Sequence, residues 1–182
     1  EWLVKHDGAE VIWLEVNPDG FIDLAKLEAF LNEKAEEVAL ISLMWANNET
    51  GVIQDIPAIT KLASRFGIPV HSDAVATFGH LPISFKQSGL TTMSISAHKI
   101  GGPIGVGALI VARSAKLVSL IHGGGQERDI RSGTLDVPAI ASLAAAVEES
   151  VRETRSVITA RRVAATARAA RIPLCRSPST RF

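Results

Sequence analysis

A lysine between a short strand-like stretch and a cluster of glycines is the strongest candidate for chemistry in this chain. Residues 92–95 alternate polar and apolar side chains as a strand does, and the glycines and proline of residues 101–107 prevent a helix from continuing past Lys99. A lysine amine attacks a carbonyl only when it is unprotonated, a state favoured by shelter and by a neighbouring cation such as His98. Lys99 is therefore a candidate nucleophile at a strand end, although an isolated lysine is more commonly a solvated surface cation.

Polar side chains also follow two other predicted strands. Residues 68–72 form an apolar stretch that leads to Asp73, and the apolar residues 38–44 lead to Asn48. Ligands of open parallel sheets bind beyond the carboxyl ends of the strands, so these side chains can converge with Lys99 although they are distant in sequence. From the residues alone, Asp73 also fits a helix cap, and the asparagine pair that includes Asn48 also fits a turn.

Ser96 and His98 are candidate donors to an anion. They lie two residues apart at one strand end, so their side chains share a side, and both can donate hydrogen bonds. On sequence alone, a histidine such as His98 is more commonly an ordinary, partly buried side chain. His71, His98 and His122 lack the short spacing of zinc ligands, and the chain has one cysteine, so we expect no metal site.

A glycine-rich stretch follows further along the chain. Residues 122–128 read His-Gly-Gly-Gly-Gln-Glu-Arg, and residues 131–134 read Arg-Ser-Gly-Thr and end at Thr134. Such a loop can expose backbone N–H groups to an anion, although glycines alone are a weak signal. The alternative is a surface loop held by ion pairs of Arg128 and Arg131.

Strand and helix patterns alternate, which predicts an α/β fold with a mostly parallel sheet and helices on both faces. The first helix begins after Asp23, and the second opens at residues 54–55 with Pro57 in its first turn and Gly67 at its end. A third helix begins at Val137, with apolar residues on one face. The predicted strands are residues 9–16, 38–44, 68–72, 92–95, 107–112 and 117–121.

Composition describes an ordinary globular domain. The chain has 182 residues, is 47% hydrophobic and 21% charged, and carries a formal net charge of zero, which gives no indication of a polyanionic partner. No apolar run approaches the roughly 20 residues that cross a bilayer, and one cysteine fits a reducing compartment. We expect a cytoplasmic protein. Because the chain begins at Glu1, as if within an element, we also expect an internal piece of a longer protein.

The composition changes after Glu153. Residues 154–182 contain seven arginines and no acidic residue, and they are rich in alanine up to Ala170. We expect a long helix to about Ala170, followed by a disordered tail over residues 173–182. Nucleic-acid binding is not favoured, because no aromatic side chains alternate with the arginines to stack on bases.

Four blocks of sequence closely resemble the NifS/IscS-type cysteine desulfurases, which are pyridoxal-phosphate (PLP) enzymes of the class V aminotransferase family. The blocks are MWANNETGVIQ, HSDAVATFGHLPI, SISAHKIGGPIGVGALIV and IHGGGQERDIRSGTLDVP, in the order of that family. The resemblance extends from about residue 9 to about residue 149. It implies that residues 1–150 are an incomplete large domain of the PLP-transferase fold type I, and that residues 151–182 lie outside it.

The resemblance also implies a role for each candidate residue. Lys99 would form the Schiff base with PLP, and Asp73 would keep the pyridine nitrogen protonated, so that the ring acts as an electron sink. Ser96 and His98 would donate to the phosphate. Asn48 would bond the phenolic oxygen of the cofactor and help to orient the substrate.

The same resemblance implies a homodimer, because the threonine that matches Thr134 contributes to the phosphate site of the neighbouring subunit. One position departs from the common pattern. Many relatives carry glutamine three residues after the aspartate and use it for a second bond to the phenolic oxygen, which Ala76 cannot make. The resemblance therefore implies one contact fewer to the phenolic oxygen, whereas the implied roles of Lys99 and Asp73 are unaffected.

The activity implied is conversion of L-cysteine to L-alanine, with sulfur passed to an enzyme cysteine and then to an acceptor or scaffold protein for iron–sulfur cluster assembly or another sulfur-transfer pathway. Cys175 is the only cysteine present, and its surroundings do not resemble the catalytic loop of the family. We therefore expect the 182-residue chain alone to be inactive. The alternatives are another class V enzyme, such as a selenocysteine lyase or an aminotransferase, and a non-catalytic dimerisation scaffold.

Overall fold

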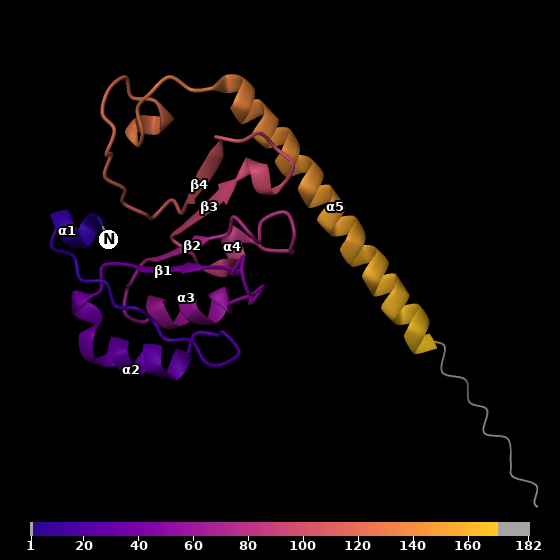
Figure 1. Cartoon of the computed structure of the whole chain (residues 1–182), viewed down its shortest axis with the longest axis horizontal. Coiled ribbons are helices and arrows are strands. Elements are labelled where there is room, and N and C mark those ends of the chain that lie inside the picture. The colour runs from indigo at the N-terminus through magenta and orange to yellow at the C-terminus, as the bar shows by residue number, and fades with distance from the viewer. Residues whose placement is uncertain (1, 171–182) are drawn as a thin grey trace, which may run out of the picture.

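The computed structural model describes residues 2–170 and contains a four-stranded sheet in the order β1-β2-β3-β4 (Figure 1). Strands β1, β2 and β3 are parallel, and β4 pairs antiparallel with β3. This confirms the predicted α/β class and its mostly parallel sheet. The strands are β1 (Ile41–Met44), β2 (Val70–Asp73), β3 (Thr92–Ser96) and β4 (Gly107–Val111). The helices are α1 (Trp2–His6), α2 (Leu24–Lys34), α3 (Ile56–Ser64), α4 (Phe85–Ser88) and α5 (Val137–Ala170), with 3₁₀ turns η1 (Ala35–Glu37), η2 (Ala97–Lys99) and η3 (Glu127–Asp129).

Helices α2 and α3 begin where their capping residues predict. The Asp23 carboxylate accepts hydrogen bonds from two backbone N–H groups in the first turn of α2, and Asp55 accepts one from the Ala58 N–H group in α3. Pro57 lies in the first turn of α3, where its missing N–H group costs nothing. Helix α3 ends at Ser64 rather than at Gly67, and a turn with Gly67 at φ +69° leads into β2.

The two faces of the sheet differ in burial. Register pairs His71 with Thr92 and Asp73 with Ser94, so the side chains of each pair point to the same face. The helix-covered face packs against α2 and α3 and carries Ile41, Leu43, Val70, Ser72, Met93 and Ile95. The open face carries Ser42, Met44, His71, Asp73, Thr92, Ser94 and Ser96, which are half-buried or exposed. The expectation that helices cover both faces is therefore not met in the part of the chain described.

Two predicted strands are wrong. Residues 9–16 form an extended segment whose only pairing is one bridge between Val16 and Ile22, and Trp13 is 85% exposed. Residues 117–121 also form no ladder, and Leu120 is 90% exposed. Both segments have the composition of strands, but a strand requires a neighbouring backbone to accept its hydrogen bonds. Among residues 2–170, no neighbour provides it.

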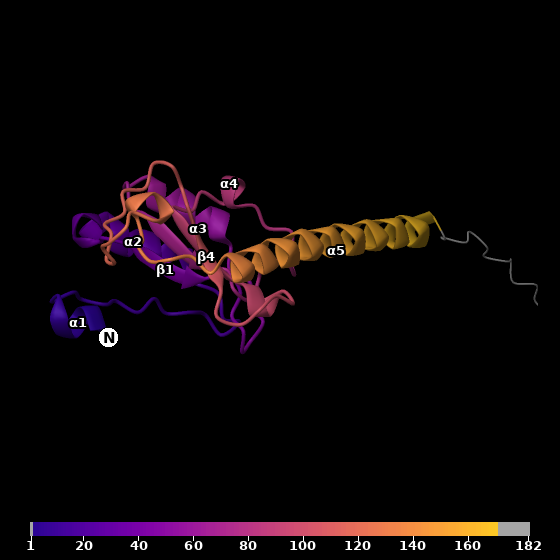
Figure 2. The same cartoon turned by 90° about the horizontal axis from the view of Figure 1, so that it is seen from above.

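Helix α5 passes η2 and then extends away from the sheet (Figures 1 and 2). Its predicted start at Val137 and end at Ala170 are confirmed. The predicted apolar stripe is only partly buried, since Leu143 is buried whereas Ile140 is 40% exposed. The predicted tail over residues 173–182 lies outside the described residues. Within residues 2–170, no helix has both the length and the hydropathy needed to cross a membrane.

Candidate functional site at the carboxyl ends of the strands

The carboxyl ends of the three parallel strands meet at one edge of the sheet. Register places Met44 beside Asp73 and Asp73 beside Ser94. Ser96, two residues after Ser94, therefore lies at the same edge, at the end of β3. Ser96 in turn pairs with Gly107 at the start of the antiparallel strand β4. The prediction that these polar strand ends converge is therefore confirmed at the level of the backbone.

Asp73 is the last residue of β2, and its side chain points to the open face. The carboxylate oxygen Oδ1 accepts a hydrogen bond from the Val75 N–H group at 2.8 Å, and the Asp73 carbonyl accepts one from the Trp45 N–H group at 2.8 Å. The side chain therefore caps a turn rather than the helix that sequence alone allowed. It is half-buried, which leaves the carboxylate accessible from the open face.

Ser96, His98 and Lys99 lie on β3 and on the single turn η2 that follows it. The Ser96 hydroxyl is 2.7 Å from the Nδ1 atom of His98, which confirms that the two side chains share a side. The turn is closed by the Ala97 carbonyl, which accepts hydrogen bonds from the N–H groups of Ile100 and Gly102 at 3.0 and 2.9 Å. The Lys99 side chain is exposed beyond this turn.

Asn48 follows β1 at the same edge and is exposed. Its Nδ2 group donates to a carboxylate oxygen of Glu49 at 2.9 Å. The preceding residue, Asn47, accepts hydrogen bonds from the N–H groups of Glu49 and Thr50, both at 2.9 Å. The asparagine pair thus forms a turn, as sequence allowed. Asn48 is exposed on this turn, beyond the carboxyl end of β1.

Thr134 is not joined to the other candidates by any hydrogen bond within residues 2–170. Strand β4 ends at Val111 opposite Thr92, so the chain leaves the sheet at the edge away from Lys99 before it enters the glycine-rich loop. In that loop the Gly133 N–H group donates to the Gln126 side chain at 3.0 Å, and Thr134 is exposed.

Two further histidines lie near the site: sequence reasoning weighed His71 only as a zinc ligand, and it did not consider His80. The Nε2 atom of His80 lies 2.9 Å from the Lys99 carbonyl oxygen. His71 lies two residues before Asp73 on the open face, with its Nδ1 atom 2.9 Å from the Thr92 hydroxyl. Burial lowers the pKa of His71, and the Asp73 carboxylate opposes this effect. No sequence spacing identifies His80, because its contact with Lys99 spans 19 positions.

The donor set fits a flat, anionic cofactor. One edge of the sheet carries an amine, a carboxylate, a hydroxyl and an imidazole, which are the groups that PLP requires.

The backbone after Lys99 is packed closely enough to need glycine. A Cβ atom at Gly107 would lie 2.6 Å from the Ile95 carbonyl oxygen, and one at Gly102 would lie 2.8 Å from the Ala97 Cβ atom. Ala76 is half-buried in the turn after Asp73, with only a methyl group to present.

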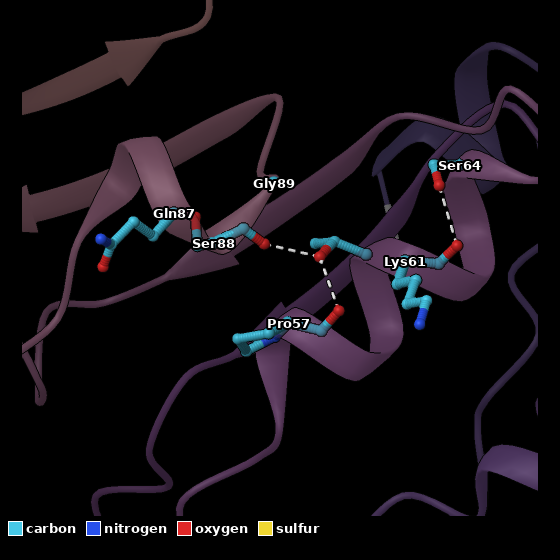
Figure 3. Close-up of a pocket in the computed structure, with 7 residues that line it drawn as sticks. Pro57, Lys61, Ser64, Gln87, Ser88 and Gly89 are labelled. Atoms are coloured by element: carbon cyan, nitrogen blue, oxygen red, sulfur yellow. Dashed lines mark hydrogen bonds between the residues drawn. The ribbon is translucent and has the colours of Figure 1, made fainter.

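A shallow hollow of about 240 Å³ lies elsewhere, on the outer side of the helix-covered face (Figure 3). It is formed between α3 and the turn that joins α4 to β3, and the hydroxyl of Thr60 beneath it donates to the Ser88 carbonyl at 2.5 Å. The Lys61 amine points from α3 into solvent. The hollow brings no carboxylate or imidazole near that amine, so it is not the candidate site. Its lining residues are Pro57, Thr60, Lys61, Ser64, Gln87, Ser88 and Gly89.

Comparison with known proteins defines first the structural class and then the family. A NifS-like protein from Rickettsia africae superimposes with a TM-score of 0.73 at 40% identity over 78% of this chain and 39% of that one. The structure described as SspA in complex with cysteine gives a TM-score of 0.74 at 38% identity over 81% of this chain and 42% of that one. The fold is therefore that of NifS-like proteins.

Sequence relatives agree with the structural class. The IscS-like cysteine desulfurase of Mycobacterium tuberculosis is 49% identical over 150 residues, which are 82% of this chain and 38% of that protein. The model of the family described as Aminotransferase class-V matches residues 1–182, beyond the segment in which we found the motif resemblance. The chain belongs to the class V aminotransferase family. It spans less than half the length of the curated relatives that it matches.

Proposed function

We propose that this chain supplies part of the active site of a PLP-dependent cysteine desulfurase. The observation that best supports this proposal is that Asp73, at the end of β2, lies at the same edge of the sheet as Ser96, His98 and Lys99, which end β3 and follow it. A relative that is 49% identical over 82% of this chain is named an IscS-like cysteine desulfurase, which supports this activity. Because the chain spans 38% of such a relative, the activity is proposed for the longer protein.

Each residue has a physical task in this proposal. The Lys99 amine holds the aldehyde of the cofactor, and the Asp73 carboxylate stabilises positive charge on the pyridine nitrogen. The Ser96 hydroxyl and the His98 imidazole lie 2.7 Å apart, close enough to donate to one phosphate group. Asn48, on the turn after β1, would bond the phenolic oxygen of the cofactor. When bound, PLP provides an electron sink for the α-carbon of the amino-acid substrate.

We further propose that L-cysteine is the substrate, L-alanine is the product, and the sulfur leaves through an enzyme cysteine persulfide. A neighbour in structure is described as a complex with cysteine, which supports this substrate. The sulfur acceptor would be a protein of iron–sulfur cluster assembly or another sulfur pathway. We place the enzyme in the cytoplasm, because a single cysteine fits a reducing compartment.

The proposal includes a homodimer in which Thr134 serves the partner's phosphate site. The exposure of Thr134 and the exit of β4 away from Lys99 support a contact to another subunit. We also propose that residues 1–150 belong to the large domain and that residues 151–182, into which α5 continues, extend beyond it.

The test uses the full-length protein loaded with PLP. Lys99→Ala removes the absorbance band of the lysine-bound cofactor, whereas Lys86→Ala, an exposed lysine on α4, leaves it unchanged. Supplying cysteine or alanine as the amino donor then separates a desulfurase, which releases sulfide and alanine from cysteine, from an aminotransferase. A band that survives Lys99→Ala rejects the proposed site. If no band forms at all, the chain is a non-catalytic scaffold.

The isolated 182-residue chain provides a second check. We propose that it releases no alanine from cysteine, because no cysteine within it resembles the catalytic loop of the family. Alanine production by the purified chain that Lys99→Ala abolishes would show instead that it holds a complete site.

A further inference from the structure

The segment that follows β2 connects the Asp73 carboxylate to the backbone of Lys99. We name residues 74–80 the β2 turn. It starts at the hydrogen bond from the Val75 N–H group to Asp73 and continues with two N–H groups that donate to the Ala74 carbonyl. It ends where the His80 N–H group donates to the Thr77 carbonyl at 3.1 Å. The backbone of the β2 turn is therefore closed by hydrogen bonds along its length.

At the end of this turn, the His80 side chain reaches the Lys99 carbonyl, with its Nε2 atom 2.9 Å from the oxygen. A carbonyl only accepts hydrogen bonds, so His80 presents an N–H group at Nε2. Another carbonyl of the same 3₁₀ turn, that of Ala97, accepts hydrogen bonds from two backbone N–H groups. Among the hydrogen bonds of residues 2–170, the Lys99 carbonyl has the His80 imidazole as its partner.

A second contact fixes the position of His80 independently of its ring. Gly79 has φ +78°, and a Cβ atom there would lie 2.7 Å from the Ile100 Cγ2 atom and 2.9 Å from the Ser150 side chain. The Thr154 hydroxyl donates to the Gly79 carbonyl from α5. The β2 turn is therefore held between the residue after Lys99 and α5, and only glycine permits this approach.

We propose that His80 is a positioning residue for Lys99. Its Nε2–H group holds the Lys99 carbonyl, so that the single turn η2 keeps one backbone conformation and the lysine side chain leaves the edge in one direction. The β2 turn thereby sets Lys99 relative to Asp73, the residue from which the turn starts. The proposal rests on the proposed function, in which Lys99 binds the cofactor. His80 acts through the backbone of Lys99 and does not contact the cofactor.

The experiment compares two side chains of similar reach at this position in the full-length apoprotein. In His80→Gln the amide N–H can still donate to the carbonyl, whereas His80→Met has no donor. The readout is the rate at which added PLP produces the lysine-bound absorbance band. We expect His80→Met to slow this rate by about threefold to tenfold, the factor that one ordinary hydrogen bond sets. His80→Gln should stay within about twofold of the original rate, because the donor is retained.

A cofactor-free measurement supports the kinetics. Acylation of Lys99 by a water-soluble amine reagent, followed by peptide mass spectrometry, reports how uniformly its amine is presented. We expect His80→Met to change the extent of Lys99 labelling and to leave Lys86 labelling unchanged, and His80→Gln to leave both unchanged. Equal behaviour of the Gln and Met variants in rate and labelling would overturn the proposal.

The outcomes distinguish this inference from the proposed function. A cofactor band that persists in Lys99→Ala rejects the proposed function. A band lost in Lys99→Ala together with an unchanged rate in His80→Met rejects only the role of His80.

Discussion

The two faces of this sheet carry the same strands and serve different purposes. On the helix-covered face, Val70 and Met93 are 2% and 1% exposed and pack beneath the fully buried Ile56 and Ile59 of α3. On the open face, the register partners along β2 and β3 are His71 with Thr92 and Asp73 with Ser94, all half-buried. One face is closed by apolar contact, and the other retains polar groups within reach of a ligand.

This difference follows from the period of two along a strand. Each residue on the helix-covered face fixes its neighbour on the open face, so the packing of Ser72 against the core also aims Asp73 away from it. Stability and chemistry are therefore assigned to alternate positions of one strand. Substitutions on the two faces should separate the two properties, which the following predictions examine.

The largest expected effect is on the stability of the helix-covered face. Ile59→Ala removes a side chain that is 1% exposed, and we expect it to lower the free energy of unfolding by about 2–5 kcal/mol through lost burial and an incompletely filled cavity. The matched control is Leu109→Ala on the open face, where the side chain is 52% exposed and the cost should be much smaller. Urea denaturation of the purified chain measures both. Equal losses would mean that the open face is covered as fully as the other.

The next largest expected effect is a loss of activity without a loss of stability. In Asp73→Asn, the amide oxygen can still accept the Val75 N–H bond, but the negative charge is lost. We expect turnover of the proposed full-length desulfurase to fall by at least about tenfold, since a nearby carboxylate stabilises a cation by one pKa unit or more. The denaturation midpoint should change little. A variant with unchanged turnover would show that Asp73 only organises the turn.

Two buried threonines provide a matched pair of substitutions with a smaller expected effect on stability. Thr60 and Thr77 are 5% and 0% exposed, but only the Thr60 hydroxyl is hydrogen-bonded within the described residues. Thr60→Val leaves the Ser88 carbonyl without this donor, and we expect a cost of about 0.5–1.5 kcal/mol. Thr77→Val removes an unpaired hydroxyl and should be neutral or slightly stabilising. Denaturation curves of the two variants test the difference, and a larger loss in Thr77→Val would reveal a partner of that hydroxyl outside residues 2–170.

The helix-covered face was predictable from sequence because its signals are local. Asp23 and Pro57 mark helix starts through bonds and angles within one turn of the chain, and both helices begin there. The strands at residues 9–16 and 117–121 were wrong because the apolar pattern is local, whereas a ladder needs a distant partner.

The site was predictable only to the level of strand ends. The pattern identified Asp73 and Lys99 as ends of neighbouring strands, and the register agrees with that. It gave no sign of the contact between His80 and Lys99, which depends on the path of the β2 turn and on the positive φ of Gly79. Such a contact is a property of tertiary packing, and neither residue type nor spacing encodes it.

The smallest expected effect tests how open the open face is. Burial lowers the pKa of His71, so folding favours its neutral ring. The unfolded chain then binds a proton first, near pH 6.5, and the stability that His71 contributes is present above that pH and is lost as the pH falls. The decrease should be small, because the ring is half-buried and the Asp73 carboxylate opposes the effect of burial.

Denaturation midpoints at about pH 7.5 and about pH 5.5, on either side of the ordinary histidine pKa, measure this contribution in the original chain and in His71→Gln. Other groups titrate over the same range, so only the difference between the two proteins reports on His71. We expect the original chain to lose more stability on acidification than His71→Gln. An identical loss would mean that water reaches the His71 ring freely. The open face would then be accessible to water along its whole length, and not only at the edge that carries Asp73 and Ser96.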